Sequence, residues 1–363
     1  MTHLIPMTSF GRKRAGILVC VCLVLLAGCH QPSRDHRPKI TITEVPKADL
    51  GGPQKMGYLA GSVSDAEPGD HVVLYARSGV WWLQPFANNP LTTIQPDQVW
   101  KNSTHLGIEY AALLVEPGFH PALRLAALPA VGNGVLAVTS LKGEGSETII
   151  PKVLHFSGYD WTVNTSDNDR GGVTNSYDPD NAWVDAKGYL HLRMMSRNGK
   201  LSCAEVSLER SLGYGLYRFV VQDSAHLDPS ATVGLFTFDE LSANENRTNE
   251  LDIELSRWGN AASKNAQYVV QPFFVPENVS RFMAPAGELT HSFRWEPGKV
   301  TFQTTRGAAL GTGQKLVSEK VFTSGVPVPA SEKVHMDLYD FQHSKNPSRL
   351  PTEVVVEKFE YLP

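Results

Sequence analysis

An alternation of acidic and apolar residues in the second half of the chain constrains its fold more than any other feature. Residues 249–255 read Asn-Glu-Leu-Asp-Ile-Glu-Leu. Successive side chains of a β-strand point to opposite faces, so this stretch would place Glu250, Asp252 and Glu254 on one face and apolar side chains on the other. Neighbouring like charges destabilise a sheet. The stripe therefore indicates a strand that buries one face in a core and uses the acidic face for catalysis or binding.

The rest of the chain favours β-structure in two modules. At 363 residues it is long enough for about two domains. Its 30 Gly and 24 Pro separate short apolar runs, and no helical period lasts beyond a turn or two. We expect an accessory β-sandwich at 39–145 and a larger two-sheet sandwich at 146–363. Candidate strands of the larger module lie at 189–194, 215–221, 232–238 and 354–359.

Charge and motif content exclude several classes of function. The net charge is −4 and no long Lys/Arg run follows the first twenty residues, so nucleic acid is not expected as a partner. There is no Gly-rich phosphate loop and no His/Cys metal spacing, so we expect neither cofactor nor metal. Strand alternation explains the run 335–337, His-Met-Asp, better than a metal site does. Cys203 is expected to be buried, and the protein to be a monomer.

The N-terminus has the pattern of an export signal. Residues 12–14 are Arg-Lys-Arg, and an apolar run follows at 15–27. These are the basic and hydrophobic regions of a secretory signal, and the run is too short for a permanent membrane span.

The end of that signal, Leu-Ala-Gly-Cys at 26–29, resembles the lipobox of bacterial lipoproteins. The resemblance implies that residues 1–29 form a lipoprotein signal peptide, that Cys29 is lipidated, and that 30–38 is a tether. The protein would then be anchored to a membrane of the cell envelope, facing an extracytoplasmic compartment. His30 after the cysteine would favour the outer membrane if the host is Gram-negative. The alternative is an ordinary secretory signal with an incidental cysteine.

The carboxylate stripe suits glycoside hydrolysis. Glu250 and Glu254 lie four residues apart, so an extended strand would separate their backbones by roughly 13 Å, at about 3.3 Å per residue. If both side chains lean inward, their carboxyl groups approach to about 5–6 Å, close to the separation in a retaining glycosidase. Asp252 lies between them, where it can hydrogen-bond to the nucleophile and tune the coupled titration of the cluster.

The order Glu-Leu-Asp-Ile-Glu resembles the catalytic signature of family-16 glycoside hydrolases, the group of laminarinases, lichenases, agarases, carrageenases and xyloglucan transferases. The resemblance implies a concanavalin A-like jelly roll, with Glu250 as nucleophile, Asp252 as assisting carboxylate and Glu254 as acid/base. The uninterrupted spacing is nearer to lichenases and xyloglucan-active members than to laminarinases. The chain departs from the family at 337–339, where Asp-Leu-Tyr replaces Asn-Leu-Trp.

Four further residues are candidates for substrate binding. Trp258 would stay on the carboxylate face if the strand continued beyond Glu254. Arg257 either recognises an acidic substituent or is solvated. Trp183 and Trp161 either stack on sugar rings or fill the core.

The leading hypothesis is a retaining endo-β-glycosidase that hydrolyses a β-glucan-like polysaccharide. One alternative is a non-catalytic polysaccharide-binding surface lipoprotein, and another is a transglycosylase of the same fold. A structural envelope protein with Ca²⁺ on the stripe is disfavoured, because no Asp/Asn/Gly loop frames the strand.

Overall fold

The structure is a computed structural model, and it describes residues 37–52, 55–166, 175–197, 200–241, 249–308, 314–341 and 351–363. The predicted signal peptide, Cys29 and most of the tether lie outside these residues. Within the described part, no helix is long and apolar enough to cross a membrane. The helices that it contains are short 3-10 turns: η1 (Ser146–Thr148), η2 (Pro179–Asn181) and η3 (Pro276–Asn278).

Residues 39–142 form a three-stranded and a six-stranded sheet. The strand order of the first is β1 (Lys39–Glu44), β2 (Met56–Ser64) and β6 (Val99–His105). The second runs β8 (Arg124–Leu125), β4 (Val80–Gln84), β3 (His71–Ser78), β7 (Glu109–Val115) and β9 (Val135–Lys142), with β5 (Leu91–Thr93) paired to β3.

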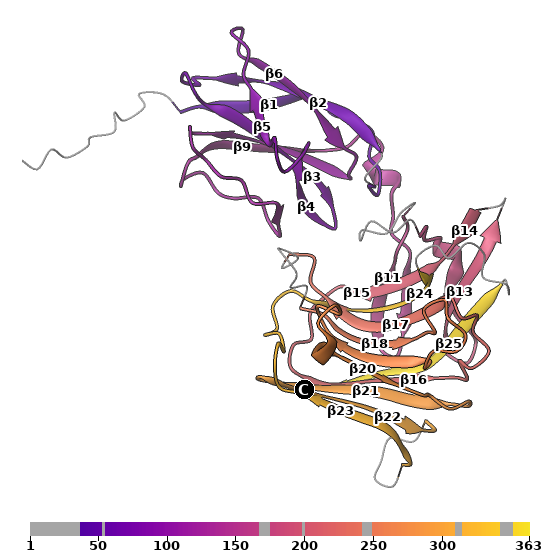
Figure 1. The fold of residues 1–363 in the computed structure, drawn as a ribbon. Helices are drawn as coiled ribbons and strands as arrows, with labels where there is room; N and C mark the ends of the chain where they lie inside the picture. Colours follow the sequence, from indigo (N-terminus) through magenta and orange to yellow (C-terminus); the bar gives the residue numbers. More distant parts are fainter. Residues whose placement is uncertain are drawn as a thin grey trace, which may run out of the picture. The chain divides into compact units, whose positions relative to one another are not determined.

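Residues 153–362 form two eight-stranded sheets (Figure 1). One, called here the carboxylate sheet, runs β10 (Val153–Phe156), β11 (Tyr159–Val163), β15 (Ala204–Leu208), β24 (Lys333–Asp340), β17 (Ala231–Phe238), β18 (Leu251–Leu255), β19 (Ala266–Val270) and β20 (Val279–Phe282). The second sheet runs β12 (Ala182–Val184), β13 (Leu190–Arg197), β25 (Thr352–Leu362), β16 (Gly215–Val221), β21 (Leu289–Glu296), β22 (Lys299–Arg306) and β23 (Leu316–Phe322), with β14 (Lys200–Ser202) paired to β13.

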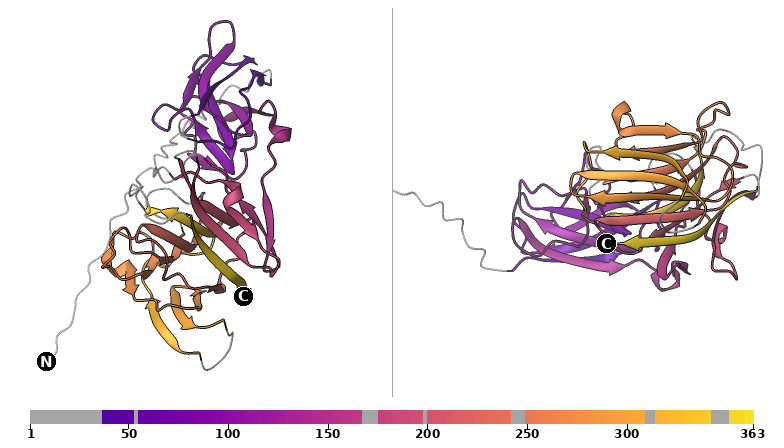
Figure 2. Two further views of the ribbon diagram at one scale, coloured as in Figure 1. Left: turned by 90° about the vertical axis from the view of Figure 1, so that its right-hand side faces the viewer. Right: turned by 90° about the horizontal axis from the view of Figure 1, so that it is seen from below.

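The predicted all-β fold class, with a large two-sheet sandwich, is confirmed. Each of the four candidate strands corresponds to a strand of the structure: β13, β16, β17 and β25. In Figure 1, β15, β24, β17, β18 and β20 lie in one layer, and β25, β16, β21, β22 and β23 in another. The view from below in Figure 2 shows orange and yellow strands of this region running side by side.

The two large sheets share one hydrophobic core. Leu251, Ile253 and Leu255 of β18 belong to it, together with aromatic side chains such as Phe293 and Phe302 of the second sheet. Every second residue of β18 is thus held by burial, at about 1.5–3 kcal/mol for each large apolar side chain. This anchoring fixes which face of β18 carries the acidic residues.

A buried histidine lies on the core side of the second sheet. His291 of β21 is fully buried, and its Nδ1 lies 2.9 Å from Thr304 Oγ1, which also accepts a hydrogen bond from Tyr268 Oη at 2.7 Å. Burial lowers the pKa of His291 to about 3. In the unfolded chain the ordinary value is about 6.5.

We expect the fold to lose stability through His291 as the pH falls below about 6.5. The His291 imidazole then binds a proton in the unfolded chain but stays neutral in the folded chain. The loss should reach about 2 kcal/mol between pH 7 and pH 5 and continue down to the folded-state pKa. Urea unfolding at both pH values should show that the wild type loses about this much more stability than His291→Leu between pH 7 and pH 5. An equal loss in both proteins would contradict the assignment.

Candidate active site

The acidic strand is shorter than the sequence predicts. β18 begins at Leu251, and Asn249 before it has a left-handed φ of 48°. Thr237 bridges this irregularity, because its Oγ1 donates to the Asn249 carbonyl at 3.0 Å and accepts from the Leu251 N–H at 3.1 Å. Glu250 therefore precedes the strand, although its carbonyl still accepts a hydrogen bond from the Gln271 N–H at 3.2 Å.

The register of six neighbouring strands places one residue from each in a row across the carboxylate sheet. The row runs Glu205, Asp337, Gly234, Glu254, Gln267, Arg281. Gly234 contributes no side chain, and a Cβ there would lie 2.5 Å from Asp337 Oδ1. That oxygen already accepts a hydrogen bond from the Gly234 N–H at 2.8 Å. The row therefore has side chains on either side of β17 and none on β17 itself, where Gly234 stands.

Asp252 is almost completely buried between two hydrogen-bonding partners. Gln271 Nε2 donates to Asp252 Oδ2 at 2.9 Å. Burial raises the pKa of Asp252 well above its usual range, the charges of Glu250 and Glu254 raise it further, and so does a side-chain hydrogen bond with Glu250. Two carboxyl groups can hydrogen-bond only if one holds a proton. The raised pKa of Asp252 favours Asp252 as the group that holds it.

Glu254 is half-buried on the same strand and has three partners. Burial raises the pKa of its carboxyl group and the charge of Glu250 adds to this, while hydrogen bonds from Gln267 and Trp258 and the charge of Arg281 act in the opposite direction. Gln267 Nε2 donates to Glu254 Oε2. The net direction is upward, toward the protonated form that a general acid needs.

The strand β24 adds a further carboxyl group to this face. Burial raises the pKa of Asp337 well above its usual range, and the charge of Glu205 raises it further. His335 Nδ1 lies 2.7 Å from Glu205 Oε1, and its ring stacks on Phe236 at 5.0 Å. Tyr339 lies two residues beyond Asp337, and burial raises the pKa of its hydroxyl group well above 10.

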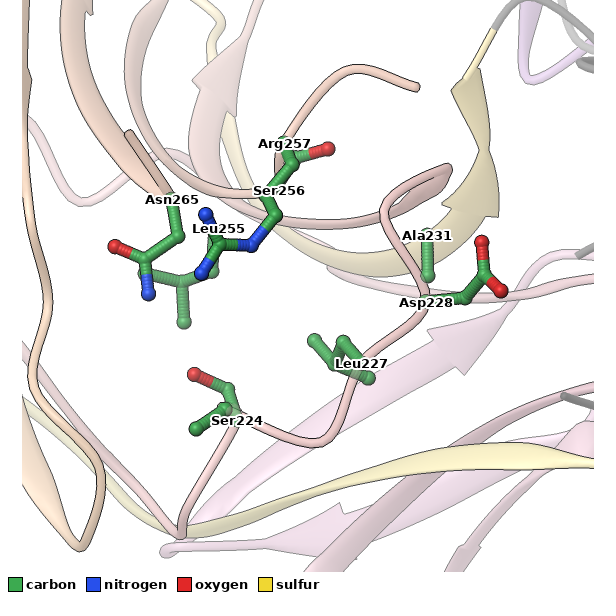
Figure 3. Close-up of a pocket in the computed structure, with 9 residues that line it drawn as sticks. Ser224, Leu227, Asp228, Ala231, Leu255, Ser256, Arg257 and Asn265 are labelled. Atoms are coloured by element: carbon green, nitrogen blue, oxygen red, sulfur yellow. The ribbon is translucent and has the colours of Figure 1, made fainter. Parts of the chain in front are cut away.

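A separate cavity lies beyond the end of β18 (Figure 3). Leu255, Ser256 and Arg257 line it from one side, and Ser224 and Leu227 from another. It encloses about 20 Å³, which is room for about one water molecule. The cavity is too small for a sugar ring.

Two of the predicted substrate-binding tryptophans do not lie at the carboxylates. Trp161 is fully buried in the core, where its Nε1 donates to the Phe156 carbonyl at 3.1 Å. Trp183 lies on β12 of the second sheet, stacked on His191 at 4.8 Å. Trp161 therefore fills the core, and Trp183 lies on the sheet that does not carry the carboxylates, so the structure does not bring either of them to this site.

The other two candidates follow β18 in a turn. Trp258 is not on a continued strand as predicted, since β18 ends at Leu255 and Trp258 has a φ of 47°. It nevertheless turns back to hydrogen-bond with Glu254. Arg257 Nη1 donates to the carbonyls of Ala261 at 3.2 Å and Ser263 at 2.5 Å, so it braces this turn.

Comparison with known proteins gives structural neighbours and no family. No protein-family model matches the sequence, and no curated protein matches it. The structure is similar to a β-glucanase of Bacillus licheniformis, with 18% identity, 60% of this chain and 99% of that chain covered, and a TM-score of 0.44. It is also similar to a β-1,3-glucanase of Mycobacterium marinum, with 14% identity, 56% and 90% covered, and a TM-score of 0.44.

A further neighbour is an immunostimulatory antigen and pseudo β-1,3-glucanase of Mycobacterium tuberculosis, with 16% identity, 54% and 88% covered, and a TM-score of 0.42. At these identities and TM-scores, the similarity carries no conclusion about activity.

Sequence reasoning missed several residues that contact the carboxylates. Gln267 and Gln271 are four residues apart, as Glu250 and Glu254 are, and this equal spacing is a usable signal once the two segments are known to pair. The sequence does not indicate that Arg281 and Gly234 belong to this site, because nothing in it sets the register of their strands against β18.

Proposed function

We propose that the protein is a retaining endo-β-glycosidase that hydrolyses a β-glucan-like polysaccharide. The observation that carries the proposal is the difference in environment among three adjacent carboxyl groups. Asp252 and Glu254 lie where burial favours their protonated forms, and Glu250 accepts the hydrogen bond of a protonated Asp252. Retaining hydrolysis needs an ionised nucleophile beside a protonated acid.

In the first step, a Glu250 oxygen attacks the anomeric carbon while Glu254 transfers its proton to the leaving glycosidic oxygen. A glycosyl ester of Glu250 forms as the glycosidic bond breaks. Asp252 keeps its proton, and its hydrogen bond orients the Glu250 carboxylate.

In the second step, the Glu254 carboxylate accepts a proton from water, and the water oxygen displaces Glu250 from the anomeric carbon. Two inversions restore the original anomer. A sugar hydroxyl in place of water would give transglycosylation by the same residues.

We expect the β-anomer of the reducing end to form first from a β-linked glycan. Proton NMR during the first minutes, before mutarotation, measures this directly. Laminarin, lichenan, xyloglucan, agarose and carrageenan form the substrate panel. Initial release of the α-anomer would contradict a retaining mechanism. A protein that binds glycan but cleaves no member of the panel would favour the binding-protein alternative.

A further inference from the structure

Two glutamines of the β19 segment hold the carboxyl groups in the same way. Gln267 donates from Nε2 to Glu254, and Gln271 donates from Nε2 to Asp252 at 2.9 Å. The amide oxygen of each glutamine accepts a hydrogen bond from a second donor, which is not one of the carboxyl groups. Arg281 Nε donates to Gln267 Oε1 at 2.9 Å, and the Phe273 N–H donates to Gln271 Oε1 at 2.7 Å.

These outer donors decide which way each amide faces. The oxygen and nitrogen of a glutamine amide have nearly the same size, so shape alone would allow either orientation. A guanidinium has donors and no acceptor, so only the amide oxygen can face Arg281. The NH₂ group of Gln267 then has to face Glu254. For Gln271 the donor is a backbone N–H, which a side-chain substitution does not remove.

Arg281 is itself held in place by Trp258. Its guanidinium lies 4.2 Å from the centre of the Trp258 ring, a cation–π geometry. The Trp258 side chain in turn hydrogen-bonds to Glu254, and the Trp258 backbone N–H donates to Ser256 Oγ at 2.9 Å. A closed ring of contacts therefore lies on one side of the Glu254 carboxyl group. It runs from Glu254 to Gln267, Arg281 and Trp258 and back to Glu254.

We propose that Arg281 is a positioning residue for Glu254: by turning the Gln267 NH₂ group toward Glu254, it holds Oε2 as a hydrogen-bond acceptor and so favours the carboxylate form of Glu254. The inference rests on the proposed function only in naming Glu254 the acid/base, since the orientation of the amide holds whatever reaction the site performs.

The charged and titratable groups around Glu254 set the direction of the expected effect. Glu250 and Asp252 lie along its own segment, Asp337 and Tyr339 come from β24, and Arg281 comes from β20. On β17 the paired residue is Gly234, without a side chain. Among these groups only Arg281 is a cation.

Two consequences of losing Arg281 act in the same direction. The ionised form of Glu254 loses a nearby positive charge, and the Gln267 amide becomes free to turn its oxygen toward the carboxylate. Both raise the pKa of Glu254. Because Arg281 is exposed, water and salt screen its charge, so the orientation of the amide should account for most of the change.

The test is a titration of Glu254 that does not depend on catalysis. In protein labelled with ¹³C at glutamate Cδ, the Glu254 resonance is assigned by its absence in Glu254→Gln. We expect Arg281→Met to raise the titration midpoint by about one pH unit, and the shift to persist in 0.5 M salt.

Arg294→Met is the matched control, since Arg294 is an exposed arginine of the second sheet, and it should leave the midpoint unchanged. The proposal is overturned if Arg281→Met does not move the midpoint. It is also overturned if 0.5 M salt abolishes the shift, because charge alone would then explain the effect. If Arg281→Met shifts the Glu254 midpoint but the wild-type protein cleaves no glycan, the proposed function is contradicted and this inference is still supported.

Discussion

Glu250→Gln is expected to reduce glycan hydrolysis by roughly 10⁴-fold or more, because an amide oxygen is too weak a nucleophile to form the glycosyl ester. The core-facing residues of β18 are untouched, and the Glu250 carbonyl keeps its bond to Gln271. Circular dichroism and retention on the polysaccharide should therefore remain close to the wild type. Reducing-sugar release measures the loss.

Glu277→Gln is the matched control for this experiment. Glu277 is an exposed residue of η3 and is distant in sequence from the acidic strand. This variant should hydrolyse glycan at the wild-type rate. Wild-type turnover by Glu250→Gln would remove Glu250 from the mechanism.

Glu254→Gln is expected to lower kcat on polysaccharide by about 10²- to 10⁴-fold, the usual contribution of a general acid. The first step should recover on an aryl glycoside, because a dinitrophenolate leaves without protonation. The second step should recover with azide, a nucleophile that needs no general base. Comparing kcat for glycan and aryl glycoside, with and without azide, measures both effects.

The product separates the two carboxylate variants. Azide with Glu254→Gln should yield a β-glycosyl azide, since Glu250 still forms the ester on the opposite face of the sugar. Glu250→Gln should give no β-azide. A Glu254→Gln variant that is equally slow on both substrates and unaffected by azide would exclude Glu254 as the acid/base.

The sequence predicts the acidic face of β18 well, because a period of two combined with apolar residues at every second position allows only one packing. Leu251 and Ile253 lie in the core, and Asp252 and Glu254 on the opposite face, as expected. The start of the strand is less predictable. The left-handed φ of Asn249 and the bridging hydroxyl of Thr237 depend on tertiary contacts that no local pattern encodes.

The partners of the carboxylates could not be predicted for a different reason. Asp337 and Arg281 join the row through the register of strands that are far apart in sequence, and a shift of one residue in any pairing would move each to the other face. Trp161 illustrates the remaining ambiguity: a tryptophan on a strand fits a core or a sugar platform equally well until the facing sheet is known.

The position of β24 has a consequence for how the protein acquires its site. β24 is among the last strands of the chain, yet it lies between β15 and β17, in the interior of the carboxylate sheet. Forming these pairings requires the closure of long loops, which slows folding. Asp337 can join Glu254 only after nearly the whole chain is available. During refolding, the carboxylate row should therefore form late, and a chain cut shortly before β24 would lose the middle of this sheet and not merely its edge.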